Sequence, residues 1–242
     1  LPASRGWAAS PDLLLAYVGE ILTRRPGLIV ECGSGVSTVW AALALRTLGG
    51  SGRVVALEHD AAFRESTLAA LAEHGLGDLA EVRLAPIDTV TVDGQDRPWY
   101  TASALDGLDG IEVLFVDGPI GSLAPESRYP AVPLLRDRFA PGAVILLDDA
   151  DRPEEQQVLA HWLADWPQLD SQQLPLEKGA ARIVVPEAVP ARNGGPGELG
   201  QPGAGGERGE GGTVRLEEAT LVASGQSPTD QQQAEEAGSG DR

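Results

Sequence analysis

Acidic residues follow several of the apolar runs in this chain, and a glycine-rich turn follows one of them. The run Leu28–Val30 leads into Glu31, and Gly33-Ser34-Gly35 comes shortly after it. Glycines let the backbone bend sharply and approach a ligand, and the start of a following helix offers free N–H groups. A carboxylate beside such a turn suits a cationic or hydroxyl-rich ligand better than a pyrophosphate. The simpler alternative is a tight turn that binds nothing.

Other acidic residues occupy the same kind of position. They follow the apolar runs 54–57, 113–116 and 143–147, and they are Glu58, Asp117 and the pair Asp148-Asp149. In open α/β sheets, ligands bind outside the carboxyl ends of the strands. We therefore expect these acids to gather at one edge of a sheet. Each acid alone is weak evidence for a site, but the set is more specific.

The hydropathy pattern predicts strands that alternate with helices. Strands are expected at residues 28–30, 54–57, 81–84, 113–116 and 143–147, with a closing hairpin of 172–176 and 181–185, and helices at 11–23, 37–48, 61–74, 130–139 and 153–166. Continuous apolar runs are typical of parallel strands that are buried on both faces. Residues 88–110 carry no pattern that assigns them. The predicted fold is α/β, a Rossmann-like, doubly wound, mostly parallel seven-stranded sheet with a C-terminal antiparallel hairpin.

The composition changes abruptly near Pro186. Residues 187–242 contain no aromatic residue and are dominated by Gly, Glu, Gln, Ser and Pro. Such a segment buries too little apolar surface to offset the entropy lost on ordering. We therefore expect a folded domain over residues 1–186 and a disordered tail over 187–242.

Charge and cysteine content narrow the choice of partners. The net charge is -18, which disfavours binding to the phosphate backbone of nucleic acids. Cys32 is the only cysteine, so neither a disulfide framework nor a thiolate metal cluster is expected. No apolar run approaches the roughly 20 residues that span a bilayer. We expect a cytoplasmic protein that acts on a small molecule and binds neither nucleic acid nor membrane, and a homo-oligomer is an open alternative.

Glu58 stands where a carboxylate can accept both hydroxyls of a ribose. Enzymes that bind NAD use the same device, so Glu58 does not identify the nucleotide. The dinucleotide fingerprint Gly-x-Gly-x-x-Gly is incomplete, however, because Thr38 stands where the third glycine belongs. The alternative for Glu58 is a solvated cap of the following helix.

These motifs resemble those of the class I methyltransferases that depend on S-adenosylmethionine (SAM). Glu31-Cys32-Gly33-Ser34-Gly35 is similar to the family's first motif, Asp/Glu-x-Gly-x-Gly, and Val55-Ala56-Leu57-Glu58 to its second. The hairpin after the fifth strand is also a feature of that family, and the resemblance covers residues 10–186. It implies that the glycine turn approaches the methionine part of SAM and that Glu58 holds the ribose. The full set of implied cofactor contacts is Glu31, Gly33, Ser34, Gly35, Ser37, Thr38, Glu58, His59, Pro86 and Ile87, the last three near the adenine.

The second half of the domain resembles the catechol O-methyltransferase-like group. In that group an acid after the fourth strand and an Asp-Asn or Asp-Asp pair after the fifth hold a metal, which matches Asp117, Asp148 and Asp149. Neighbouring carboxylates repel unless a cation joins them, and oxygen ligands suit Mg²⁺ or another hard divalent cation. Asp117 and Asp148 are then the candidate catalytic residues, since a metal there would bind and activate a substrate hydroxyl. The alternative is that Asp149 caps a helix and Asp117 supports the turn at Gly118-Pro119.

The chain departs from that group at one position. A lysine shortly after the fourth-strand acid serves there as general base, whereas Gly118-Pro119-Ile120 follow Asp117 here and no lysine is nearby. The metal, or a carboxylate such as Asp117, would have to take the proton, unless the substrate needs no deprotonation.

Two aromatic and basic pairs stand in the segments expected to cover the site. Trp99-Tyr100 and Arg128-Tyr129 either shape an acceptor pocket or serve packing and a surface ion pair, and we favour the second interpretation. The predicted function is methyl transfer from SAM to a small-molecule acceptor, at a hydroxyl oxygen, with a divalent metal as a candidate assistant. The alternatives are an NAD(P)-dependent oxidoreductase and a non-catalytic protein that binds SAM or a nucleotide.

Overall fold

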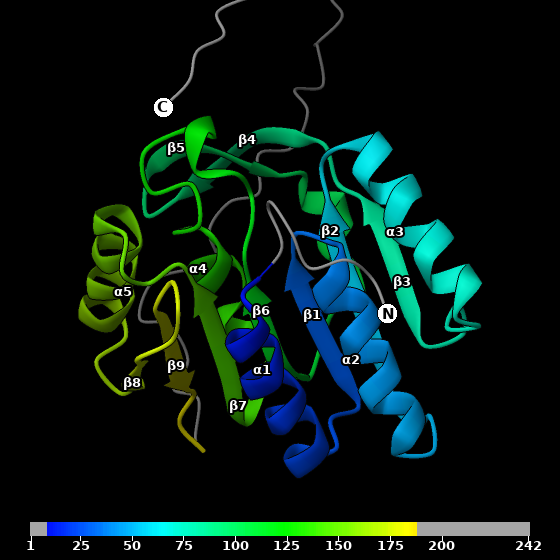
Figure 1. Ribbon diagram of the computed structural model, residues 1–242. Helices are drawn as coiled ribbons and strands as arrows, with labels where there is room; N and C mark the ends of the chain where they lie inside the picture. The colour runs from blue at the N-terminus through cyan, green and yellow to red at the C-terminus, as the bar shows by residue number, and fades with distance from the viewer. Residues whose placement is uncertain (1–8, 188–242) are drawn as a thin grey trace, which may run out of the picture. The chain divides into compact units, whose positions relative to one another are not determined.

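Seven strands form one sheet in the computed structural model, which describes residues 9–187 (Figure 1). The strands are β1 (Leu28–Cys32), β2 (Arg53–Glu58), β3 (Ala80–Leu84), β6 (Ile111–Val116), β7 (Phe139–Asp148), β8 (Asp170–Leu174) and β9 (Ala180–Val184). Their order is β3-β2-β1-β6-β7-β9-β8. Strand β9 is antiparallel to both of its neighbours, and the other pairs in this sheet are parallel. The predicted fold class is confirmed, including the closing hairpin.

Helices cover both faces of the sheet (Figure 1). They are α1 (Pro11–Arg24), α2 (Val36–Thr47), α3 (Ala61–Glu73), α4 (Ala131–Leu135) and α5 (Pro153–Asp165). Two apolar clusters follow from this arrangement, because successive strand residues point to opposite faces. Ile29 packs in the cluster that holds α1, α2 and α3, whereas Val30 packs in the cluster that holds α4 and α5. The central strands are therefore apolar at nearly every position, as expected of parallel strands covered on both sides.

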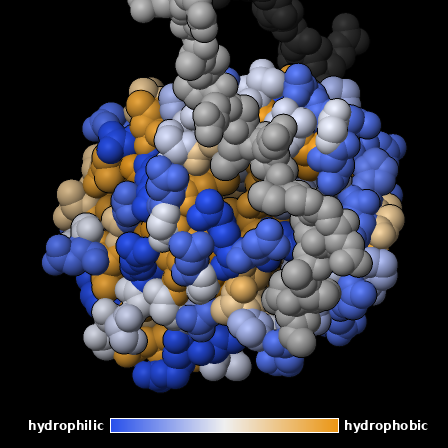
Figure 2. Space-filling model, turned by 180° about the vertical axis from the view of Figure 1, so that it is seen from behind, coloured by the Kyte–Doolittle hydropathy of each residue, from blue (hydrophilic) through white to orange (hydrophobic). Residues whose placement is uncertain are grey.

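Figure 2 shows the molecule from behind, the side turned away from the viewer in Figure 1. Hydrophilic and hydrophobic residues are mixed over that face, as is usual for the surface of a folded domain. Within the part of the chain that the structure describes, no helix combines the length and the apolar character needed to cross a membrane.

A second sheet fills the segment that the sequence pattern left unassigned. Strands β4 (Ile87–Val92) and β5 (Gln95–Tyr100) form an antiparallel hairpin, followed by a short 3₁₀ helix at Ala102–Leu105. Asp93 and Gly94 connect them with φ angles of 51° and 77°. Asp-Gly is a strong signal for a two-residue hairpin turn with positive φ, so the sequence did contain the evidence. In Figure 1 the hairpin lies beyond the end of the main sheet toward which the arrows of β1 and β7 point.

The predicted element bounds agree with the structure to within two residues except in one region. The helix expected at 130–139 is α4 followed by a 3₁₀ turn at Arg136–Arg138, and β7 begins at Phe139 rather than at residue 143. Pro141-Gly142 therefore lies inside β7. The register of β6 against β7 shifts between the pairs Ile111–Phe139 and Val113–Val144, so these residues form an irregularity in a longer strand. Residues 1–8 and 188–242 lie outside the described residues, so the boundary of the domain and the tail stay predictions.

Candidate functional site

The glycine turn joins the end of β1 to the start of α2. Gly33 and Gly35 have φ angles of 95° and 148°, a region that residues with a side chain rarely adopt. The N–H of Gly33 donates to the carbonyl of Leu57, at 2.9 Å, which ties the turn to β2. The backbone here therefore has a shape that glycine permits, and it leads into the free N–H groups of the 12-residue helix α2.

Glu31 lies buried beneath this turn with no exposed surface. Its Oε1 accepts from the Tyr17 hydroxyl at 2.9 Å, and its Oε2 accepts from the Thr38 hydroxyl at 2.5 Å. Thr38 Oγ1 in turn accepts from the N–H of Gly35 at 3.1 Å. Burial raises the pKa of Glu31 to about 7, although the hydrogen bonds from Thr38 and Tyr17 act in the opposite direction. Glu31 thus positions the turn from below, and its carboxylate is not open to a ligand.

The raised pKa of Glu31 makes the stability of the protein depend on pH. The unfolded chain releases this proton near pH 4.5 and the folded chain near pH 7. The contribution of protonated Glu31 to the free energy of unfolding is therefore fully present below pH 4.5 and is lost as the pH rises to 7. The loss is at most about 3 kcal/mol. We expect Glu31→Gln to lose less free energy of unfolding than the wild type between pH 5 and pH 8, as measured by urea denaturation. Equal losses in the two proteins would contradict the assignment.

Glu58 links the end of β2 to the glycine turn. Its Oε2 accepts from the N–H and the hydroxyl of Ser34, at 3.1 and 3.0 Å, and its Oε1 accepts from the N–H of Asp60 at 2.9 Å. The Nδ1 atom of His59 lies 3.1 Å from Oε1. The alternative that Glu58 is a solvated helix cap is wrong, because only 5% of the residue is exposed and Asp60 caps α3. The Glu58 carboxylate therefore joins two segments, with Oε2 bonded to the glycine turn and Oε1 bonded to the start of α3.

The residues expected near an adenine lie next to Glu58. The N–H of Ala85 donates to the Glu58 carbonyl at 2.7 Å, so the chain leaving β3 passes this strand end. Pro86 is exposed and Ile87 half-buried, and the His59 and Tyr100 rings are 6.4 Å apart. The fold thus brings the predicted cofactor residues together around the ends of β1, β2 and β3, with Ser37 half-buried in the first turn of α2.

The three predicted metal ligands also come together. One carboxylate oxygen from each of Asp117, Asp148 and Asp149 lies within 4.8 Å of the others. The side chain of Asp117 is 26% exposed, whereas the other two are nearly buried. Burial raises the pKa of Asp117 to about 8 and that of Asp148 to about 6, and the neighbouring carboxylates act in the same direction.

Arg128 sits among these acids. Its Nη2 lies 3.1 Å from Asp117 Oδ1 and 3.2 Å from Asp149 Oδ2, and its Nη1 donates to the carbonyl of Asp148 at 2.9 Å. Only 5% of the side chain is exposed. The expectation of a surface ion pair is therefore wrong, since the pair is buried. No local pattern marks Arg128 in the sequence, because its partners are 11 and 21 positions away.

The only lysine of the chain also belongs to this region. Lys178 lies in the turn between β8 and β9, and its charge lowers the pKa values of Asp117 and Asp148. The carbonyl of Lys178 accepts from the N–H of Asp151 at 3.4 Å, which holds the turn beside the end of β7. No lysine is near Asp117 along the sequence, but the folded chain brings Lys178 close to the acids.

The glycine turn and the acid cluster are in direct backbone contact. The N–H of Asp117 donates to the carbonyl of Cys32 at 3.1 Å. A Cβ added to Gly33 would lie 3.5 Å from the N atom of Gly118, and one added to Gly118 would lie 2.5 Å from the Tyr100 hydroxyl. Tyr100 is fully buried with Trp99 in the apolar cluster, so this pair serves packing as expected. The turn and the acids therefore lie next to each other at the ends of β1 and β6.

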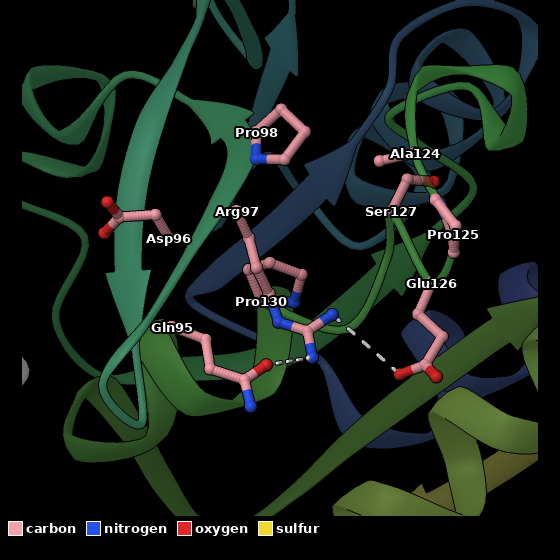
Figure 3. Close-up of a pocket in the computed structure, with 9 residues that line it drawn as sticks. All are labelled: Gln95, Asp96, Arg97, Pro98, Ala124, Pro125, Glu126, Ser127 and Pro130. Carbon is pink, nitrogen blue, oxygen red and sulfur yellow. Dashed lines mark hydrogen bonds and ion pairs between the residues drawn. The ribbon is translucent and has the colours of Figure 1, made fainter.

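A cavity of about 240 Å³ opens beside this site, between β5 and the segment 124–130. Figure 3 shows Arg97 reaching across it, with Nη2 3.3 Å from Gln95 Oε1 and Nη1 3.9 Å from Glu126 Oε2. The lining residues include neither the strand-end acids nor the glycine turn. Ser127, which lines it, donates to the carbonyl of Pro119 at 3.4 Å, and this bond ties the cavity wall to the turn that follows Asp117.

Comparison with known proteins places this geometry in a family. The family model described as a methyltransferase domain matches residues 30–150, half of the chain. The chain therefore belongs to this methyltransferase family, and its fold and motifs are those of the class I, SAM-dependent enzymes. Among curated proteins, none is similar enough in sequence to count as a match.

Solved structures with the same fold include several methyltransferases. One from Geobacter sulfurreducens has 18% identity and a TM-score of 0.56 over 73% of this chain and 79% of its own. TomG, an O-methyltransferase from Streptomyces achromogenes in complex with SAM, has 21% identity and a TM-score of 0.55 over 74% and 82%. An O-methyltransferase from Bacillus cereus in complex with SAH has 22% identity and a TM-score of 0.54 over 76% and 84%. These likenesses support the fold.

The acid cluster is a poor fit to a divalent metal as its side chains stand. Three carboxylates within reach of one another are the correct ligand type. However, the guanidinium of Arg128 already contacts one carboxylate oxygen of Asp117 and one of Asp149, so a cation bound by these acids would share them with a buried positive charge. Metal binding therefore stays a prediction, and the pairing of Arg128 with these acids disfavours it. We assign the metal no step in the reaction.

Proposed function

We propose that this protein transfers the methyl group of SAM to a hydroxyl oxygen of a small-molecule acceptor. The observation that carries this proposal is the contact between the two halves of the site, since Asp117 follows the strand next to the glycine turn and its N–H donates to Cys32. A donor bound at the turn would then lie beside a carboxylate. TomG and the Bacillus cereus protein are both O-methyltransferases, which supports oxygen as the acceptor atom.

The donor half suits SAM because it combines a glycine turn that a ligand can approach closely with a carboxylate that could accept ribose hydroxyls. The carboxylate of the methionine part would face the free N–H groups at the start of α2, near Ser37 and Thr38. Glu58 would accept the ribose hydroxyls, exchanging its contacts to Ser34 and His59 for contacts to the ligand. His59, Pro86 and Ile87 would then border the adenine.

The acceptor half depends on Asp117. It has the most exposed side chain of the three clustered acids, so a bound acceptor could reach it. In the proposed reaction the ionised form of Asp117, whose pKa burial raises to about 8, takes the hydroxyl proton while the oxygen attacks the methyl carbon and the bond from that carbon to sulfur breaks, leaving S-adenosylhomocysteine (SAH). Asp148 is 1% exposed and its Oδ1 accepts from the N–H of Asp149 at 2.6 Å, so we give it a positioning role. The fold's contribution is to align donor and acceptor in a site shielded from water.

The cavity beside β5 supports an acceptor of small size. At about 240 Å³ it is smaller than most drug-binding pockets, which hold roughly 300–1,000 Å³. We propose that the part of the acceptor remote from the reacting oxygen occupies it. Arg97, Gln95 and Ser127 offer polar contacts there.

The absence of nucleic-acid binding, the cytoplasmic location and a homo-oligomeric state remain predictions.

Calorimetric titration together with a transfer assay tests the proposal. We expect SAM and SAH to bind and NAD not to bind. With SAM labelled on the methyl group, label should appear on a hydroxyl oxygen of one or more members of a panel of phenols and small alcohols. Binding of NAD without SAM would support the oxidoreductase alternative, and binding of SAM with no transfer to any acceptor would support the non-catalytic one.

A further inference from the structure

We propose that Arg128 is the built-in cation of the acid cluster, so that methyl transfer at this site needs no divalent metal. The part that concerns methyl transfer rests on the proposed function. The part that concerns metal exclusion can be tested on the free protein.

The guanidinium of Arg128 lies where it would repel a metal ion bound by the acids. Nη2 of Arg128 lies 3.1 Å from Asp117 Oδ1 and 3.2 Å from Asp149 Oδ2, within hydrogen-bond distance of both. A Mg²⁺ or Ca²⁺ ion would bind such oxygens at about 2.0–2.6 Å. An ion on either oxygen would therefore lie within about 6 Å of Nη2, in a buried place where like charges repel strongly.

Arg128 is also held too firmly to move aside. Its Nη1 donates to the carbonyl of Asp148, and its Nη2 donates to the carbonyl of Asp117, both at 2.9 Å. Asp148 is the last residue of β7 and Asp117 directly follows β6, and these two strands are paired, so the sheet restrains both carbonyls. Glu155 on α5 lies 3.5 Å from Nη1. A metal that displaced the guanidinium would leave Glu155, 4% exposed, without its buried partner, which is costly.

The charges of the cluster nearly balance without a metal. Four carboxylates meet here, those of Asp117, Asp148, Asp149 and Glu155. Three cations face them, namely Arg128, Arg152, whose Nη1 is 2.9 Å from Asp149 Oδ2, and Lys178. Even with all four acids ionised, only one negative charge remains, and a divalent ion would reverse its sign rather than cancel it. Among the cluster's oxygens in the described residues, Asp149 Oδ1 is buried without a hydrogen-bond partner, while Oδ2 of the same carboxylate already contacts both Arg128 and Arg152.

Arg128 thereby acts as a positioning residue. Two of its contacts are to Asp117, one to the carbonyl and one to the carboxylate. Together they hold the partly exposed carboxylate at the end of β6, next to the glycine turn. The planar guanidinium can make both contacts at once, which an ammonium group cannot do with the same geometry.

Titration with Mn²⁺ alone, followed by electron paramagnetic resonance, tests metal exclusion. We expect no bound Mn²⁺ in the wild type at millimolar concentration and saturable binding in Arg128→Gln, because this substitution leaves the carboxylates uncompensated. Arg128→Lys keeps the charge and should still exclude Mn²⁺. The matched control is Arg138→Gln, which removes an arginine that pairs with the exposed Asp109, and it should gain no binding.

Activity measurements test the second part. Methyl transfer by the wild type should be the same in EDTA as in Mg²⁺, within about twofold. Arg128→Lys should lower kcat by about tenfold or more and leave the Kd for SAM unchanged, since Asp117 loses its two-point support. A residue needed only for folding would not separate kcat from SAM affinity in this way.

Two outcomes would overturn the proposal. One is binding of Mn²⁺ to the wild type that disappears in Asp148→Asn, and the other is a folded Arg128→Gln variant that gains no Mn²⁺. If Arg128→Gln does not fold, Mn²⁺ binding measured on the wild type and on Asp148→Asn is sufficient to test metal exclusion. A failure of SAM to bind would reject the proposed function but would leave the Mn²⁺ result unaffected, so the two failures are distinguishable.

Discussion

Asp117→Asn is expected to lower kcat by about 100- to 10,000-fold and to change the Kd for SAM by less than about twofold. Asparagine has nearly the same shape and can still accept a hydrogen bond from Arg128, so the fold should be kept. It cannot take a proton from an acceptor hydroxyl, which is the role proposed for this carboxylate. Single-turnover methyl transfer and calorimetry with SAM give the two quantities separately.

The control for Asp117→Asn is Asp109→Asn. Asp109 is 78% exposed and pairs with Arg138, away from the cluster, so its kcat should match that of the wild type. If Asp117→Asn retained full kcat, the acceptor would be deprotonated by another group or would need no base. If it lost SAM affinity as strongly as activity, Asp117 would belong to the donor half of the site.

Glu58→Ala is expected to weaken SAM binding by about 100-fold. The substitution removes the acceptor proposed for the ribose hydroxyls, and hydrogen bonds to a charged group contribute about 1.5–3 kcal/mol each. It also frees Ser34, whose N–H and hydroxyl both donate to this carboxylate, so the glycine turn loses an anchor. Glu58→Gln should have a smaller effect, because the amide keeps one acceptor oxygen. Calorimetric titration with SAM and SAH measures both variants.

Glu81→Ala is the matched control for Glu58. Glu81 lies on the neighbouring strand β3, pairs with Arg83 and has a side chain that is 52% exposed, so its loss should leave SAM binding unchanged. An unchanged Kd in Glu58→Ala would mean that the ribose is held elsewhere. In that case the role given to the end of β2 would have to be withdrawn.

The main sheet could be predicted because its information is local. Most of the buried parallel strands are short apolar runs, and a helix follows β1, β2 and β7 directly along the chain. The acids at Glu31, Glu58 and Asp117 could be located for the same reason, since parallel strands bring their carboxyl ends to one edge. The hairpin β4–β5 was missed although Asp93-Gly94 marks its turn, because its strands are polar and β5 contains a proline.

Contacts between residues that are far apart along the chain could not be predicted from the sequence. Glu31 is buried because Tyr17 arrives from α1 and donates a hydrogen bond to its carboxylate. Arg128 enters the acid cluster from a segment with no repeating pattern, and Lys178 enters from the last hairpin. These partners are set by how helices and turns pack on the sheet, so no spacing along the chain reveals them.

The sequence by itself determined which strand ends carry acids and where the backbone can approach a ligand. Both depend on residues within a few positions of one another, namely an apolar run, an acid and a glycine turn. Only the tertiary structure decided what surrounds those acids. Glu31 is sealed beneath the turn, Asp117 keeps an open side chain, and a buried arginine stands where a metal was predicted. Burial and charge pairing depend on segments that meet only in the folded protein, and for that reason the chemistry of the acid cluster had to be read from the structure.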